Sequence, residues 1–184
     1  MLAGFADETD RKSILLSERI TVMTPKDTLI SWLNDAHAME KSLVQVLENH
    51  ANDAKDFPDI RSKDLEHMEV SKRHAETLRE CIERLGGNVS AAKTAMGIAG
   101  GFFQGLSTGL APDELVKNFL ADYASEHFEV ACYKALIEAA RVAGHDELIP
   151  VFEQHIRDEQ DMIRWLDQNL PKAVDSYMAQ PAGA

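Results

Sequence analysis

The amino-acid sequence predicts an all-α protein, a bundle of four helices with a long crossover between the second and third. Apolar residues recur at the helical period in four long segments, and no segment alternates with the period of a strand. Short connections join these segments into two hairpins, whereas residues 88–111 separate the hairpins. A plain up-and-down bundle is the alternative, but it would not need so long a connection.

The first hairpin is expected between residues 24 and 85. Residues 24–27 (Thr-Pro-Lys-Asp) are typical of a helix start, because threonine can cap free amides and proline suits the first helical position. The aspartate there favours the positive end of the helix dipole. We expect this helix to end near residue 51. The second helix should run from about residue 59 to residue 85, where two glycines end it.

The second hairpin is expected to begin near Pro112, which opens a proline, aspartate and glutamate start signal. Gly144 should end the third helix, and the fourth should run from about Asp146 to Leu170. Pro171 is expected to disturb the fourth helix, since proline lacks the amide that a helix interior requires.

These bounds divide the 184 residues into an N-terminal arm at 1–23, one bundle domain at 24–170 and a C-terminal tail at 171–184. A chain of this length can bury a substantial core in a single domain. The connection at 88–111 is rich in glycine, and its pattern leaves open whether it is a lid, an oligomer contact or only a link.

The charge balance argues against a nucleic-acid partner, since 31 acidic residues outnumber 19 basic ones and give a net charge of −12. No apolar run approaches the length of about 18 residues that a membrane helix needs, so no membrane association is expected. The N-terminus carries charges and no long apolar run, unlike a secretory signal. Cys81 and Cys132 do not make a disulfide framework, so a cytoplasmic location is expected.

Four polar residues lie at the centres of the four apolar stripes: Glu40, His74, Glu126 and Glu159. A buried charge costs several kcal/mol unless something compensates it. Any one of these glutamates could instead lie at a bundle end or pair with a lysine. As a set they share a level near mid-helix, and no lysine or arginine occupies a stripe centre. This pattern predicts one shared metal site.

Carboxylate with imidazole suits iron, manganese or zinc, whereas calcium prefers oxygen ligands alone. In bundles that hold two iron or manganese ions, two helices each give a Glu and the other two each give a Glu with a His three residues on. One ion could occupy the site, but two are favoured if Glu129 and His155, which lies one turn before Glu159, join it. We therefore expect two iron ions, or manganese, bound by Glu40, His74, Glu126, Glu129, His155 and Glu159.

Two further stripe residues have simpler interpretations. His67 lies on the second stripe and is interpreted as a hydrogen-bonded core or edge histidine rather than a ligand. Tyr133 faces inward one turn beyond Glu129 and could donate a proton or an electron, although core packing with a satisfied hydroxyl is the simpler interpretation.

The segments around the predicted ligands resemble the YciE/YciF family of ferritin-like bacterial stress proteins. The most specific match is 126–133 (Glu-His-Phe-Glu-Val-Ala-Cys-Tyr); 38–43 (Ala-Met-Glu-Lys-Ser-Leu) also matches, and 74–85 and 158–159 match more loosely. The likeness extends over about residues 24–170. It implies a ferritin-like four-helix bundle with a di-metal site, a homodimer and a stress-linked role.

The same resemblance implies that Glu40, Glu126, Glu129 and Glu159 are ligands and that His74 is the matching histidine on the second helix. Thr77 is a departure, because the family commonly has a glutamate three residues after that histidine. This departure puts full di-iron occupancy and oxygen chemistry in question.

The expected function is a ferritin-like stress-response protein whose di-metal site, with iron as the first choice, reacts with oxygen, peroxide or ferrous iron. An alternative is a non-enzymatic dimeric helical protein with a structural or vestigial metal site. A metal store or carrier is a third candidate.

Overall fold

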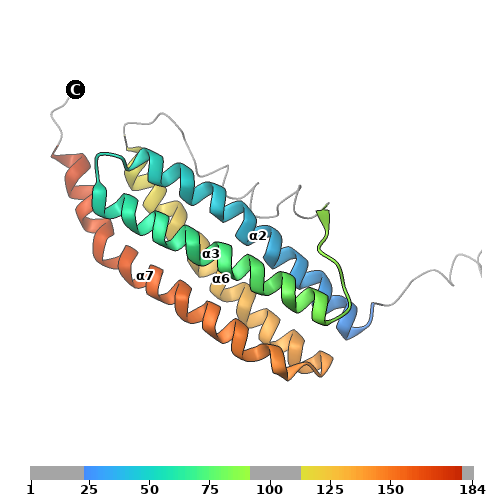
Figure 1. Cartoon of the computed structure of the whole chain (residues 1–184). Helices are drawn as coiled ribbons and strands as arrows, with labels where there is room; N and C mark the ends of the chain where they lie inside the picture. The colour runs from blue at the N-terminus through green and yellow to red at the C-terminus, as the bar shows by residue number, and fades with distance from the viewer. Residues whose placement is uncertain (1–22, 92–112, 180–184) are drawn as a thin grey trace, which may run out of the picture.

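The structure, a computed structural model, describes residues 23–91 and 113–179. Four long helices make up these ranges: α2 (Pro25–Asp53), α3 (Pro58–Arg84), α6 (Glu114–Ala143) and α7 (Ile149–Met178), the last preceded by the short 3-10 helix η1 (Asp146–Leu148). The helices lie side by side in one bundle (Figure 1), and the described residues contain no strand. The predicted all-α four-helix architecture is confirmed.

The connectivity agrees with two hairpins joined by a crossover. Short turns join α2 to α3 and α6 to α7, so each pair is antiparallel. The helices α3 and α6 run in the same direction (Figure 1), which a long connection permits and a short turn does not. Most of the predicted crossover and the predicted arm, at 92–112 and 1–22, lie outside the described residues.

Local chemistry sets the helix ends close to the predicted positions. At the start of α2, the Thr24 side chain accepts a hydrogen bond from the Asp27 amide at 3.1 Å, and Asp27 accepts one from the Thr24 amide at 3.1 Å. This reciprocal capping satisfies amides that the first helical turn leaves free. At the end of α6, Gly144 has a φ of 73°, a left-handed conformation that glycine adopts without steric cost.

The predicted end of the fourth helix at Leu170 is wrong, because α7 continues through Pro171 to Met178. A proline inside a helix costs about 3 kcal/mol, since it removes one hydrogen bond and crowds the preceding turn. Packing offsets this cost: Ala173, shortly after the proline, is buried against the apolar cluster that Phe119 and Leu166 form between α6 and α7. Residues 171–178 of the predicted tail are therefore helical.

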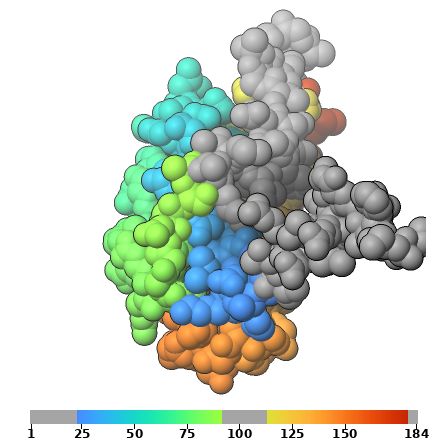
Figure 2. All heavy atoms as spheres, turned by 90° about the vertical axis from the view of Figure 1, so that its right-hand side faces the viewer, coloured from blue at the N-terminus to red at the C-terminus, as the bar shows by residue number. Residues whose placement is uncertain are grey.

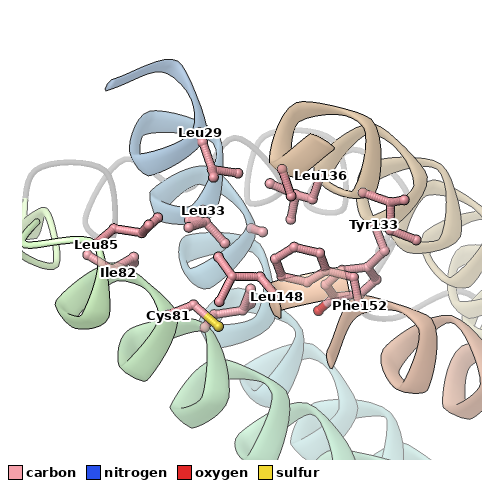
Figure 3. Close-up of a cluster of buried hydrophobic side chains, with 13 residues drawn as sticks. Leu29, Leu33, Cys81, Ile82, Leu85, Tyr133, Leu136, Leu148 and Phe152 are labelled. Carbon is pink, nitrogen blue, oxygen red and sulfur yellow. The ribbon is translucent and has the colours of Figure 1, made fainter. Parts of the chain in front are cut away.

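The largest apolar cluster fills the end of the bundle where α2 begins and α3 ends. Its buried side chains point toward one another between the four helices (Figure 3). Figure 2 views this end and shows the start of α2, in blue, between α3 in green and the α6–α7 turn in orange. We call it the apolar plug; it comprises Leu29, Leu33, Ala36, Leu78, Cys81, Ile82, Leu85, Tyr133, Leu136, Ile137, Ala140, Leu148 and Phe152.

None of the described helices is long and apolar enough to cross a membrane.

Candidate metal centre

Beyond the apolar plug, polar side chains from all four long helices meet in the bundle interior. Each is at most 3% exposed to solvent: Glu40, His67, His74, Glu126, Glu129 and Glu159. The helical repeat explains why they share one place. His67 and His74 are seven residues apart, or two turns, and Glu126 and Glu129 are three apart, so each pair lies on one face of its helix.

The first group of candidate ligands surrounds His67. Its Nε2 lies 3.1 Å from Glu126 Oε2 and 3.2 Å from Glu159 Oε2. His67, Glu126, Glu129 and Glu159 each offer one candidate ligand atom, and these four atoms all lie within 4.8 Å of one another. One metal ion could therefore contact all four residues.

The second group surrounds His74. Its Nδ1 lies 2.9 Å from Glu159 Oε1 and 3.3 Å from Glu40 Oε1, and these three residues also offer ligand atoms within 4.8 Å of one another. Glu159 belongs to both groups, with Oε2 toward His67 and Oε1 toward His74. This geometry would suit a carboxylate that bridges two ions.

Most of the converging atoms make no hydrogen bond. Both oxygens of Glu129 and of Glu159 lack a hydrogen-bond partner. So do one oxygen each of Glu40 and Glu126, and the ring nitrogens of His67 and His74 that face them. The short contacts of the two histidines are thus close approaches without hydrogen-bond geometry. Buried polar atoms without a hydrogen-bond partner are rare in folded proteins, because each lowers stability by about 1–3 kcal/mol.

A cation would satisfy these atoms together, and the donor set fits a transition metal. Carboxylate oxygens and imidazole nitrogens are ligands for iron, manganese and zinc. No lysine or arginine is buried in the ranges that the structure describes, so no side chain with a permanent positive charge does this instead. The residues present can therefore hold a metal.

Without a metal, the two histidines balance the carboxylates. Burial alone would lower the pKa of His74, but contacts with Glu159 and Glu40 raise it to about 10. The pKa of His67 is also raised, by Glu126 and Glu159 against the effect of burial. Burial raises the pKa of Glu126 to about 8 and that of Glu129 well above its ordinary value. The metal-free centre thus holds protons that a bound cation would replace.

A carboxylate on α7 orients His74. Its Nε2 lies 3.1 Å from Asp158 Oδ2, and Gln154 donates a hydrogen bond of 2.8 Å to the other oxygen of Asp158. If His74 donates its Nε2 proton to Asp158, its Nδ1 is free to bind a metal beside Glu40 and Glu159. Metal-binding histidines commonly have such a carboxylate partner, which sets the tautomer and the ring direction.

Replacing Asp158 with alanine should weaken metal binding at the His74 group about 10- to 100-fold, the usual effect of losing such a partner. Isothermal titration calorimetry with Mn²⁺ measures this loss of affinity. Glu153→Ala is the matched control, because Glu153 is an exposed carboxylate on the same helix and should leave the affinity unchanged. Equal affinities for Asp158→Ala and wild type would remove Asp158 from this role.

Five of the six residues predicted as ligands converge: Glu40, His74, Glu126, Glu129 and Glu159. The structure does not bring His155 into either group. Its Nε2 lies 2.8 Å from Thr77 Oγ1, and its ring stacks on that of His74 with centroids 3.8 Å apart. Burial, and then the neighbouring His74, lowers the pKa of His155 to about 3.

His67 was interpreted from the sequence as a core or edge histidine, but it lies among the candidate ligands. It is buried and faces two carboxylates without a hydrogen bond at Nε2. One signal could have identified it: it precedes His74 by two helical turns, so both rings face the same side of α3.

Tyr133 holds Glu40 in place. The ring is fully buried beside the centre, and the hydroxyl donates a hydrogen bond to Glu40 Oε1. The ring edge also meets His155, with centroids 4.8 Å apart. This hydroxyl is satisfied, as the simpler interpretation expected, and it contacts a candidate ligand directly.

Residues 24–179 match a protein family described as Domain of unknown function (DUF892). The chain belongs to this family. Among solved structures, a protein of Xanthomonas campestris pv. campestris is similar to this DUF892 member, with 27% identity and a TM-score of 0.71. The match covers 84% of this chain and 95% of that one.

Two further structures share the fold of this DUF892 member at lower identity. Desulfovibrio desulfuricans bacterioferritin, described with a diiron site in different catalytic states, is 22% identical with a TM-score of 0.68, covering 87% of this chain and 90% of that one. YcfI of Rhodopseudomonas palustris, for which a structural role is suggested, is 20% identical with a TM-score of 0.67, covering 81% and 96%. These likenesses establish a ferritin-like bundle.

Proposed function

We propose that this DUF892 member binds two transition-metal ions, iron or manganese, inside its bundle. The observation that most directly supports this proposal is that the two oxygens of Glu159 face two separate groups of buried side-chain atoms that lack hydrogen-bond partners. His67, Glu126 and Glu129 would hold one ion, and Glu40 with His74 the other. His155 is assigned a positioning role against the His74 ring, in place of the ligand role expected from sequence.

Iron or manganese is favoured by the number of carboxylates. The two groups together offer four glutamates and two histidines, which is the balance typical of di-iron and di-manganese bundles. No cysteine belongs to either group. A carboxylate-rich set of this kind is unlike the closed cysteine and histidine sets of structural zinc sites.

We further propose that the site couples oxidation of ferrous iron to reduction of oxygen or peroxide in a stress response, so that the electrons released by iron pass to the oxidant. When bound, a pair of redox-active metals would supply the electrons for such chemistry. The chain's own contribution is to exclude water with the apolar plug and to hold Glu40 through the Tyr133 hydroxyl. That hydroxyl is a phenolic proton in direct contact with a ligand. The resemblance to the YciE/YciF proteins and the diiron site described for bacterioferritin support this proposal.

A non-enzymatic role is the second candidate. Exposed Trp32 and Phe128 line a hollow of about 150 Å³ between α2 and α6, together with Met39 and Cys132. Exposed apolar side chains of this kind can serve a protein interface, so a homodimer is part of both candidates. The structural role suggested for YcfI favours this alternative. A cytoplasmic location is proposed for both, because Cys81 and Cys132 are free thiols.

Metal analysis separates the two candidates. Protein purified without chelators and analysed by mass spectrometry should carry about two iron or manganese ions per chain. Anaerobic ferrous iron should refill stripped protein, and the refilled protein should consume oxygen or peroxide. The double variant Glu40→Ala with Glu126→Ala should bind neither ion. Metal that binds without any consumption of oxidant would favour the structural role, and failure to bind any metal would reject the site.

A further inference from the structure

A second set of polar groups is buried on the side of the metal centre opposite the apolar plug. It consists of His50 on α2, Asp64 on α3 and Asp122 on α6, and each is at most 4% exposed. We call it the His50 cluster. His50 Nδ1 lies 2.8 Å from Asp122 Oδ1. These three residues do not converge tightly enough to be one of the candidate metal sites in the described part of the chain.

The His50 cluster reaches the metal centre through the helical repeat. Asp64 precedes His67 by three residues on α3, and Asp122 precedes Glu126 by four residues on α6. Residues three or four apart are neighbours on a helix face, with Cβ atoms about 5–6 Å apart. The cluster therefore lies one helical turn from the His67 group on two helices at once.

The His50 cluster also reaches the surface. Asn118 precedes Asp122 by one turn on α6, and it donates a hydrogen bond of 3.1 Å to Asp53 Oδ2. Asp53 is exposed and ends α2. Buried polar side chains one helical turn apart, with the hydrogen bonds His50–Asp122 and Asn118–Asp53 among them, therefore extend from the exposed α2–α3 turn toward the His67 group.

Apolar side chains lie beyond the His67 group in two other directions. The apolar plug occupies the opposite end of the bundle, and the apolar cluster around Phe119 and Met162 packs between α6 and α7. Asp158 gives the His74 ring its own link to solvent, since that carboxylate side chain is 29% exposed. On the His67 side, the His50 cluster places buried ionisable groups one helical turn from the ligands on both α3 and α6.

The groups of the cluster suit proton exchange near neutral pH. Burial, and then the charge of Asp122, raises the pKa of Asp64 to about 7. Burial would lower the pKa of His50, but the hydrogen bond and charge of Asp122 raise it. The charged groups around them are Asp53 on α2, His67 on α3 and Asp122 on α6.

We propose that the His50 cluster conducts protons between solvent at the α2–α3 turn and the His67 half of the metal centre. Its use rests on the proposed function, because a metal that binds imidazole and carboxylate displaces their protons. Each proton displaced from the His67 half passes to the Asp64 carboxylate. The Asp64 proton passes to the His50–Asp122 pair, and that pair releases one to water beside Asp53.

The first test uses the metal-free protein with ¹⁵N-labelled histidine, in which NMR measures exchange of ring N–H protons with water. Asp64→Asn and Asp122→Asn should each slow exchange at His67 by at least about tenfold, since a positioned acid–base group speeds proton transfer by about 100- to 10,000-fold. Exchange at His74 should not change, because its proton leaves through Asp158. Asp158→Ala should show the reverse pattern.

The direction of the effect separates a lost path from a damaged fold. A destabilised bundle opens more often and exchanges faster, so slowing at one histidine cannot come from unfolding. Ser71→Ala is the matched control, since Ser71 is equally buried on α3 but lies on the other side of His67 from Asp64. Unchanged exchange at His67 in both Asp variants, or equal slowing at His74, would overturn the proposal.

The second test mixes the stripped protein with Co²⁺ and a pH indicator in a stopped-flow instrument. Asp64→Asn should slow proton release and metal uptake about tenfold while equilibrium affinity stays within about threefold. If wild type binds no metal, the proposed function fails, and the exchange experiment alone decides whether the proton path exists. If metal binds and uptake is equally fast in the variant, the path is not used during loading.

Discussion

Replacing Glu159 with alanine should abolish binding of both metal ions, whereas loss of any other ligand should affect chiefly one. The reason is geometric: Glu159 Oε1 lies 2.9 Å from His74 Nδ1, and Glu159 Oε2 lies 3.2 Å from His67 Nε2. Losing a side chain that only hydrogen-bonds to a metal ligand already lowers metal affinity about 10- to 100-fold. Losing a ligand that both ions share should therefore lower the affinity for each ion by more than this. Titration with Mn²⁺, monitored by electron paramagnetic resonance, counts the bound ions.

The comparison with single-site variants makes this prediction specific. Glu40→Ala should remove the ion beside His74 and leave the one beside His67, while Glu126→Ala should do the opposite. Glu153→Ala, which changes an exposed carboxylate on α7, should leave both. If Glu159→Ala retained one ion with unchanged affinity, Glu159 would not be a bridge.

Replacing Glu129 with leucine should stabilise the metal-free protein and reduce the stabilisation that metal gives, because the ion beside His67 is lost while the ion beside His74 still binds. Glu129 is 1% exposed and neither of its oxygens makes a hydrogen bond. A buried polar group without a partner costs about 1–3 kcal/mol, and leucine of similar size avoids that cost. Thermal unfolding with and without Mn²⁺ should therefore show a higher Tm for the variant without metal and a smaller increase on adding metal.

The gain from Glu129→Leu should also grow with pH. Burial raises the pKa of Glu129 well above its ordinary value of 4.5 in the folded protein. Above about pH 4.5 the unfolded chain releases this proton while the folded protein retains it, so wild type loses stability as pH rises. The variant has no such carboxyl. A gain that stayed constant between about pH 4 and pH 7 would contradict this origin.

Exposed Glu138 on α6 provides the control for this experiment. Its carboxylate is 68% exposed and pairs with Arg141 one turn away. Glu138→Leu should change the free energy of unfolding by no more than about 0.5 kcal/mol, as is usual for surface substitutions. Glu138→Leu should also leave the increase in Tm on adding metal unchanged. If both leucine variants raised the Tm of the metal-free protein equally, the gain would come from the added apolar side chain and not from removing a buried carboxyl.

Helical periodicity was enough to identify most of the candidate centre. The direction of a side chain around its own helix follows from residue spacing, at 3.6 residues per turn. This is why Glu40, Glu126 and Glu159 could be predicted to face inward from their spacing alone, and why the capping signals at Thr24 and Gly144 located helix ends. The burial of all three glutamates agrees with that reasoning.

Periodicity did not distinguish between the histidines, because His67, His74 and His155 all lie on inward stripes. Their roles depend on how far each helix is shifted along the bundle axis relative to its neighbours. In the structure, α7 sets Glu159 level with both His67 and His74, and it sets His155 against Thr77. That shift is a property of packed helices and not of any one segment.

Residue spacing within single segments was therefore enough to predict four helices, their inward faces and a carboxylate-rich interior. Only the packed bundle shows that Glu159 faces two groups, that His67 rather than His155 joins them, and that α7 continues past Pro171. These three features have one cause. Contacts between side chains of different helices set the position of each helix along the bundle axis, and they offset the cost of a proline inside α7. Such contacts exist only after the helices pack.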